Sequence, residues 1–147
     1  MTKQEVLNQN NLNQQVSDNE LTNRQILRRI DHTQLKPYAT WSDIDRLCDE
    51  AVRYRTASVC IPPVYVKQVH DAYGDKVNIC TVVGFPLGYS TTAAKVAEVE
   101  QALADGCNEI DMVVNISDVK NGDYVKVEEE IRTSKRVCGE HILKVII

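Results

Sequence analysis

The segment Glu109-Ile110-Asp111-Met112-Val113-Val114-Asn115 carries an acidic residue inside a run that is otherwise typical of a buried β-strand. Alternation along a strand predicts that Ile110, Met112 and Val114 share one face and that Asp111 lies on the other. Because the first face is entirely apolar, we expect it to pack against helices. The segment therefore predicts a strand that places a carboxylate on the inner face of a sheet.

The same alternation applies to the last segment of the chain, His141-Ile142-Leu143-Lys144-Val145-Ile146-Ile147. It predicts that Leu143 and Val145 face helices and that Lys144 lies on the inner face, in the same interior as Asp111. Neighbouring parallel strands lie about 4.8 Å apart, so the two charges can pair if their levels match. Such a pair can serve catalysis or only hold the sheet together, and the residues alone leave both interpretations open.

Strand-like and helix-like patterns alternate along most of the chain. Strands are predicted over residues 30–33, 57–61, 77–83, 109–114 and 142–147. The helices between them are indicated by four apolar stripes: Ile44, Leu47, Cys48 and Ala51; Val66, Val69 and Tyr73; Val96, Val99 and Leu103; and Val127, Ile131, Ser134 and Cys138. This alternation predicts an α/β fold with a parallel sheet, and both a doubly wound sheet and a (β/α)8 barrel fit it.

The beginning of the chain differs in composition from the remainder. Residues 1–18 are rich in Asn and Gln and poor in apolar residues, so we expect a flexible N-terminal arm followed by one domain over residues 19–147. A short helix is predicted over residues 20–29, with Leu21, Ile26 and Leu27 directed toward a core.

The net charge and the distribution of basic and apolar residues indicate which partners the protein can bind. The net charge is −4 and the 17 basic residues are scattered, which argues against binding to nucleic acid or to an anionic membrane. The most apolar run, residues 79–88, is short and is interrupted by Gly84 and Pro86. We therefore expect a cytoplasmic protein without a membrane-spanning segment or a secretory leader.

The five cysteines and three histidines show no ligand spacing. The cysteines are odd in number and contain no C-x-x-C pair, so we interpret them as reduced core residues and expect no metal site. Cys60, in Val59-Cys60-Ile61-Pro62, is either a small core residue or a thiol that lines a substrate pocket. The polar segment 30–33 favours a hydrogen-bonded rim, and the loop 84–88 matches neither a dinucleotide-binding motif nor a P-loop.

Five segments in order along the chain resemble the deoxyribose-phosphate aldolase family. They are Ile30-Asp31-His32-Thr33-Gln34-Leu35-Lys36-Pro37, Val59-Cys60-Ile61-Pro62, Val82-Val83-Gly84-Phe85-Pro86-Leu87-Gly88, residues 109–115 and Leu143-Lys144-Val145-Ile146. The resemblance runs from about Leu21 to the end. It implies the first five strands and four helices of a (β/α)8 TIM barrel. It also implies reversible cleavage of 2-deoxy-D-ribose 5-phosphate to acetaldehyde and D-glyceraldehyde 3-phosphate, through a lysine Schiff base and without a cofactor.

The resemblance also assigns roles to residues. It implies that Asp111 is the proton donor and acceptor, that Lys144 is a supporting pocket lysine, and that Cys60 lies near the substrate. In the family the imine-forming lysine lies on the sixth strand, a lysine that lowers its pKa lies on the seventh, and the phosphate-binding loops follow strands seven and eight. Because this chain ends in its fifth predicted strand, we expect the 147-residue polypeptide alone to be inactive.

Two other hypotheses remain beside this one. A non-catalytic half-barrel could assemble with another chain through its exposed fifth strand, and a homo-oligomer is one form of such an assembly. A doubly wound binding domain unrelated to aldolases would require the five matching segments to be coincidental. Under the aldolase hypothesis the partners are small phosphosugars and aldehydes, with no nucleic acid and no membrane.

Overall fold

The computed structural model describes residues 21–147, and the predicted N-terminal arm over residues 1–18 lies outside them. Five strands form one parallel sheet in the order of the chain. They are β1 (Asp31–Thr33), β2 (Ser58–Ile61), β3 (Ile79–Val83), β4 (Glu109–Val113) and β5 (Ile142–Ile146). A doubly wound sheet reverses its strand order at a switch point, whereas a barrel keeps it sequential. The sequential order therefore confirms the partial barrel.

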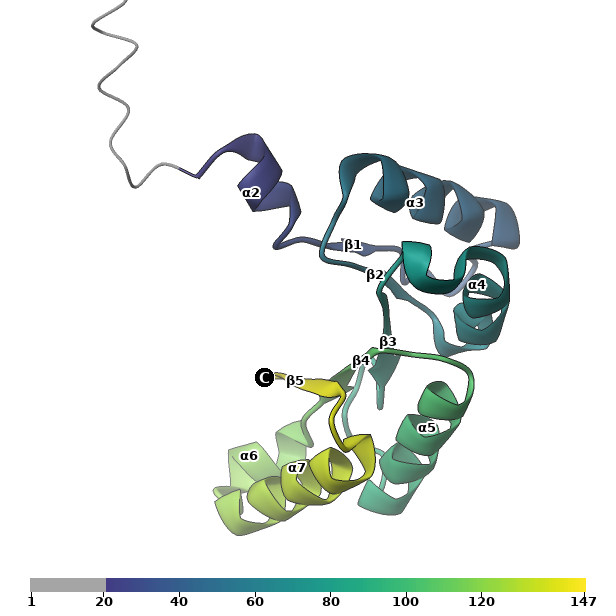
Figure 1. Ribbon diagram of the computed structural model, residues 1–147. Coiled ribbons are helices and arrows are strands. Elements are labelled where there is room, and N and C mark those ends of the chain that lie inside the picture. The colour runs from purple at the N-terminus through teal and green to yellow at the C-terminus, as the bar shows by residue number, and fades with distance from the viewer. Residues whose placement is uncertain (1–20) are drawn as a thin grey trace, which may run out of the picture.

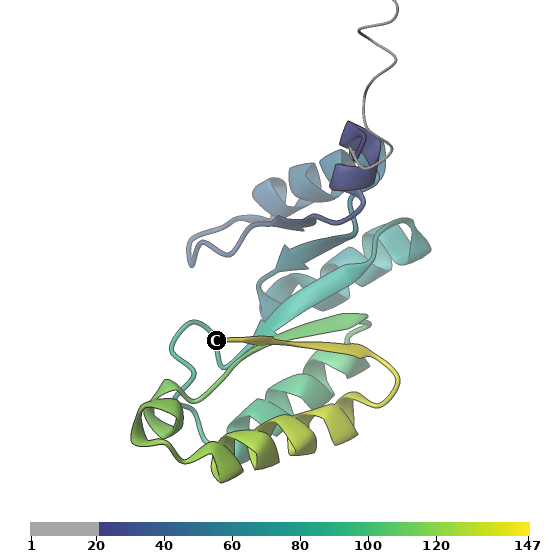
Figure 2. The same ribbon diagram turned by 90° about the vertical axis from the view of Figure 1, so that its left-hand side faces the viewer.

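The helices lie mainly on one side of this sheet (Figure 1). They are α2 (Asn23–Leu27), α3 (Trp41–Tyr54), α4 (Val66–Tyr73), α5 (Thr92–Ala104), α6 (Ile116–Asn121) and α7 (Tyr124–Cys138), with short 3-10 turns η1 (Pro63–Tyr65) and η2 (Gly74–Lys76). Figure 2 looks toward the inner face, where the strands run side by side in the same direction. No helix of residues 21–147 has the length and hydropathy needed to cross a membrane.

The core lies between the helices and the outer face of the sheet. Ile110 and Met112 of β4 are fully buried there, as the alternation predicts, together with Val59, Ile61 and Ile79 of the neighbouring strands. The stripe predicted for α3 is confirmed, since all four of its residues are buried. Apolar burial of this kind contributes about 25 cal/mol per Å², so the outer face supplies most of the driving force for folding.

A capping box begins α3. Thr40 is the N-cap, and its backbone N–H and hydroxyl both donate to Asp43 Oδ2, at 2.9 and 2.8 Å. These hydrogen bonds hold the pKa of the Asp43 carboxyl below its ordinary value, because they stabilise the ionised form. The cap fixes where the chain turns from β1 into the first helix of the outer layer.

The prediction for residues 20–29 is wrong in part. The helix α2 has only five residues and begins after the N-cap Thr22, whose side chain forms a capping box with Gln25. Leu21 and Ile26 are 45% and 43% exposed, so neither reaches a core, and Leu27 is half-buried. A single helical turn and a half at the end of the sheet offers too little surface to bury an apolar stripe.

The stripes predicted for α5 and α7 include the buried Val99, Ser134 and Cys138 but omit two buried charged residues, Lys95 and Glu130. Lys95 of α5 is fully buried, and its Nζ donates to Glu130 Oε1 of α7 at 2.9 Å and to the Val113 carbonyl at 2.8 Å. Glu130 Oε2 in turn accepts from the backbone N–H of Asn115 at 3.2 Å. This ion pair thus ties both helices to the end of β4. The helix α6, which follows β4, was not predicted.

Replacement of Lys95 by Met should destabilise the protein by about 3–5 kcal/mol, because Glu130 would remain buried without its partner. Urea unfolding followed by circular dichroism measures this loss. The matched control is Lys67→Met, which removes an exposed ion pair with Asp71 and should have a much smaller effect. Equal losses in the two variants would contradict a structural role for the buried pair.

Candidate active site

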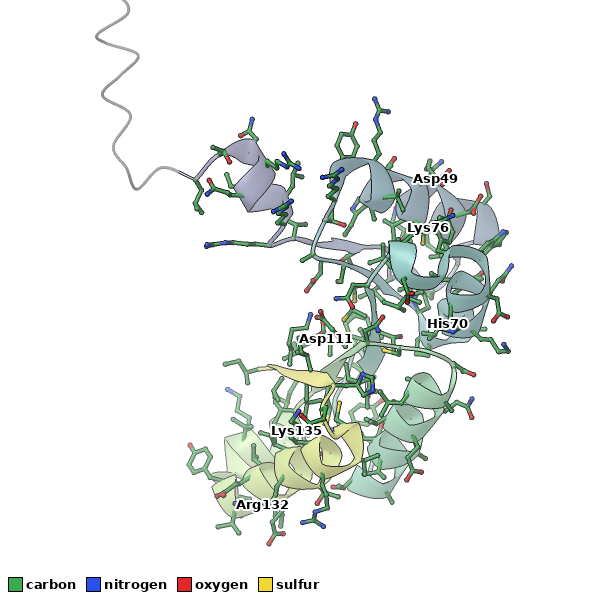
Figure 3. The ribbon with its side chains drawn as sticks, viewed as in Figure 1. Asp49, His70, Lys76, Asp111, Arg132 and Lys135 are labelled. Carbon is green, nitrogen blue, oxygen red and sulfur yellow. The ribbon has the colours of Figure 1, made fainter. Side chains whose placement is uncertain are left out.

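The inner face of the sheet gathers polar and sulfur-bearing side chains at its centre. The register places Asp111 of β4 directly beside Lys144 of β5, so the predicted shared interior is confirmed. In Figure 3 Asp111 lies at the sheet, whereas Asp49, His70 and Arg132 belong to the helical layer outside it. The residues that share the inner face include Asp31, Ser58, Cys60, Cys80, Val82, Glu109, Asp111 and Lys144.

The Lys144 ammonium contacts three carboxylates. Its Nζ lies 2.6 Å from Asp31 Oδ2, 3.0 Å from Asp111 Oδ1 and 3.2 Å from Glu109 Oε2. In a flat sheet the first and fifth strands would be four spacings apart, roughly 19 Å, which is more than a lysine side chain spans. The contact between β5 and β1 therefore requires the sheet to curl toward its inner face, as the strands of a barrel do.

The ionisation of Lys144 and Asp31 follows from this arrangement. Partial burial lowers the pKa of Lys144, but the hydrogen bond to Asp31 and the contact with Asp111 outweigh burial and raise it above the ordinary value. For Asp31, burial raises the pKa, and the hydrogen bonds from Lys144 and Ser58 lower it by more. Lys144 is therefore an ammonium at neutral pH and has no free lone pair for attack on a carbonyl.

Asp31 is a site residue that the sequence alone did not single out. The sequence of residues 30–33 predicts a hydrogen-bonded rim. In the structure Asp31 lies inside the site, because its Oδ1 accepts from Ser58 Oγ at 2.7 Å and its Oδ2 accepts from Lys144. His32 points to the other face, where its Nε2 lies 2.8 Å from Glu50 Oε2 of α3. Asp31 and His32 are consecutive on β1 and therefore point to opposite faces of the sheet. The contact of Asp31 with Lys144 of β5 shows that Asp31 is the one that belongs to the site.

Cys60 lies on the same inner face and is buried, as is Cys80 beside it on β3. The two sulfur atoms and a carboxylate oxygen of Asp111 all lie within 4.8 Å of one another. A hydrogen bond with Cys60, together with burial, raises the pKa of the Cys80 thiol. The structure thus places the predicted pocket thiol next to the predicted proton-transfer carboxylate.

The loop after β3 packs closely against the end of β4. Gly88 has a positive φ of 71°, and a Cβ at this position would lie 2.1 Å from the Val114 carbonyl oxygen. Only glycine permits such an approach. The Gly88 N–H donates to the Gly84 carbonyl at 2.8 Å, which closes the turn. This loop and the buried Lys95 therefore hold the strand that carries Asp111 from two sides.

The sequence of this chain is similar to those of known aldolases. Residues 25–147 match the model of the DeoC/LacD family aldolases. The chain belongs to this family. A deoxyribose-phosphate aldolase from Clostridium botulinum (strain Alaska E43) is 65% identical over 127 residues, which are 86% of this chain and 58% of that protein. One from Streptococcus pyogenes serotype M4 is 56% identical over 124 residues, 84% of this chain and 56% of that protein.

Solved structures of aldolases share the fold. The tetrameric deoxyribose phosphate aldolase from Aeropyrum pernix has a TM-score of 0.75 and 27% identity, and the match covers 99% of this chain and 59% of that one. QR15, an aldolase, has a TM-score of 0.79 and 34% identity over 83% of this chain and 55% of that one. This DeoC/LacD chain therefore spans a little more than half the length of the relatives it matches and has the TIM-barrel type of fold.

Replacement of Lys144 by Met should raise the pKa of Asp31, because the main stabilising partner of its carboxylate is lost. In the wild type this carboxylate stabilises the fold above about pH 4, and the contribution disappears as the pH falls through its lowered folded-state pKa. Carbon-13 NMR titration of the Asp31 side chain measures the shift. Lys67→Met, an exposed lysine on α4, is the control and should leave the titration unchanged. An Asp31 titration that is the same in Lys144→Met and the wild type would refute the coupling.

Proposed function

We propose that this protein acts as a deoxyribose-phosphate aldolase, a carbon–carbon lyase. It would reversibly cleave 2-deoxy-D-ribose 5-phosphate to acetaldehyde and D-glyceraldehyde 3-phosphate through a lysine Schiff base. The observation that carries the proposal is the ion pair of Asp111 with Lys144, 3.0 Å apart on the inner face of a chain of this family. The high identity to relatives named for this reaction supports the choice of substrate.

Asp111 is proposed to move the protons of the reaction. An imine withdraws electrons from the neighbouring carbon, and a positioned carboxylate can then accept and return protons at carbon and oxygen. The Lys144 ammonium lies 3.0 Å from Asp111 Oδ1 and holds this carboxyl group in one orientation. Asp31 of β1 and Glu109 of β4 also contact that ammonium, at 2.6 and 3.2 Å, and keep it in place.

Lys144 is not the proposed nucleophile. Imine formation needs a free amine, and the raised pKa of Lys144 keeps its amine protonated. By the family resemblance, the nucleophile belongs to a sixth strand, and Lys144 has a supporting role in the pocket. Cys60 is proposed to line the substrate side of that pocket, where it is buried next to Asp111.

The proposal includes no cofactor, and the location is proposed to be the cytoplasm. All five cysteines lie within the described residues as free, buried thiols, which suits a reducing compartment. Small phosphosugars and aldehydes are the proposed partners, with no nucleic acid and no membrane. Homo-oligomer formation is also proposed, since the Aeropyrum pernix relative is tetrameric.

A second candidate is a non-catalytic half-barrel that pairs with another chain through β5. Its support is the edge of β5, which within residues 21–147 pairs with β4 alone. Ile142 and Ile146 of this strand are also 52% and 38% exposed, on the inner face. An apolar hollow lined by Val114, Ile116 and Val119 lies beside it. Unpaired strand edges of this kind readily accept another strand.

The 147-residue polypeptide alone should show no cleavage of 2-deoxy-D-ribose 5-phosphate, and acetaldehyde with borohydride should not label Lys144. The reason is that its ammonium, held by Asp31 and Asp111, does not attack the aldehyde. Mass spectrometry of the treated chain locates any reduced adduct. An adduct on Lys144 would overturn its supporting role.

A chimera tests the proposed function directly. Residues 1–147 of this chain, joined to the remaining C-terminal part of the Clostridium botulinum relative, should cleave 2-deoxy-D-ribose 5-phosphate, whereas a non-catalytic half-barrel should not supply the proton relay. Asp111→Asn in the chimera should lower kcat by about 10²–10⁴-fold, the contribution of a positioned acid–base group. Asp71→Asn, on the exposed side of α4, is the matched control and should retain activity. A folded chimera without activity, or an Asp111→Asn chimera with full activity, would contradict the proposal.

A further inference from the structure

Three potential ligands converge on the inner face from three adjacent strands. Cys60 comes from β2, Cys80 from β3 and Asp111 from β4, and one ligand atom of each lies within 4.8 Å of the other two. Cys60 and Cys80 are register partners, so the parallel pairing itself brings the two sulfurs together. We propose that Cys60, Cys80 and Asp111 form a binding site for one soft divalent cation such as Zn²⁺ or Cd²⁺.

The spacing of the ligand atoms suits such a cation. Zinc binds thiolate sulfur at about 2.3 Å in a tetrahedral arrangement, which separates two sulfur ligands by roughly 3.8 Å. The Cys60 and Cys80 sulfurs lie within 4.8 Å of each other, so a movement of about 1 Å at most brings them to this separation. A water molecule takes the fourth position, as in open zinc sites with three protein ligands.

The chemistry of the donors selects the class of metal. Two thiolates prefer Zn²⁺, Cd²⁺ or similar soft ions, whereas Mg²⁺ and Ca²⁺ prefer oxygen ligands. Binding displaces the protons of both thiols, because the thiolate is the ligand. The buried Oδ1 of Asp111 contacts the Lys144 ammonium at 3.0 Å, and a carboxylate oxygen with one such contact retains a second lone pair for the cation.

The local charge also favours a cation. Asp31, Glu109 and Asp111 surround a single ammonium, that of Lys144, so their ionised forms leave an excess of negative charge on this face. Lys144 contacts the same oxygen of Asp111 and therefore competes with the metal for it. The site is consequently a weaker one than a structural zinc centre with four protein ligands.

The site was hidden from the sequence because its ligands are spaced by 20 and 31 positions, without a Cys-x-x-Cys pair. Only the register of β2, β3 and β4 reveals it. Cys60 and Cys80 lie on the inner face of the sheet, unlike Cys48. Cys48 is buried in the core between α3 and the sheet, away from the inner face.

Titration of the reduced full chain with Cd²⁺ alone tests the proposal without any measurement of activity. One equivalent should produce the ultraviolet charge-transfer band of a cadmium ion bound to two thiolates. The band should be lost in the Cys60→Ala/Cys80→Ala variant and retained in the matched control Cys48→Ala. Asp111→Asn should keep the band, because both thiolates remain. It should weaken Cd²⁺ affinity by more than about tenfold, which is the loss expected when a residue that only supports a ligand is replaced.

Cadmium-113 NMR of the wild-type chain provides a readout that does not depend on any variant folding. A resonance at the shift of a two-sulfur site supports the proposal. A resonance typical of oxygen and nitrogen ligands, or none, overturns it. Persistence of the charge-transfer band in the folded double variant, or its absence in the wild type, also overturns it.

Discussion

The contact between Lys144 and Asp31 is the constraint on which the site depends. It joins the last described strand to the first across the inner face, and it exists only because the sheet is curled. The same ammonium reaches Asp111 and Glu109 on the neighbouring strand. A partly buried lysine without partners would lose its charge or move to solvent, so the three carboxylates and the lysine are stable only together. The charge cluster therefore links barrel curvature to the position of the proposed proton-transfer group.

The two faces of the sheet divide the tasks of the protein. The outer face and its helices bury apolar residues such as Ile110 and Met112, which stabilise the fold. The inner face carries the charged and sulfur-bearing groups, whose burial is costly. Strand alternation allows one segment to serve both purposes, since Ile110, Asp111 and Met112 are consecutive. The buried Lys95–Glu130 pair and the loop at Gly88 then fix the end of β4, so the rigidity of the outer layer extends to Asp111.

Strand periodicity carried most of the information that the sequence offered about fold and site. The five strands, the α3 stripe and the shared interior of Asp111 and Lys144 follow from local patterns, because alternation along a strand is a local property. Asp31 and Cys80 could not be assigned in this way, since their roles depend on register between strands far apart in the sequence. Lys95 and Glu130 were missed because charged residues in helices are usually exposed, and only their mutual pairing makes burial tolerable. The short α6 has too few residues for a recognisable stripe.

The charge of the inner face also constrains where a phosphorylated substrate could be held. Three carboxylates against one ammonium leave two negative charges in excess when all four groups are ionised. A phosphate placed on this part of the face would be repelled, so its binding requires backbone N–H groups or basic residues away from this cluster. The family resemblance places the phosphate-binding loops after strands seven and eight, which is consistent with this requirement. The charge of the inner face thus separates the proposed proton-transfer group, Asp111, from any position where a phosphate can bind favourably.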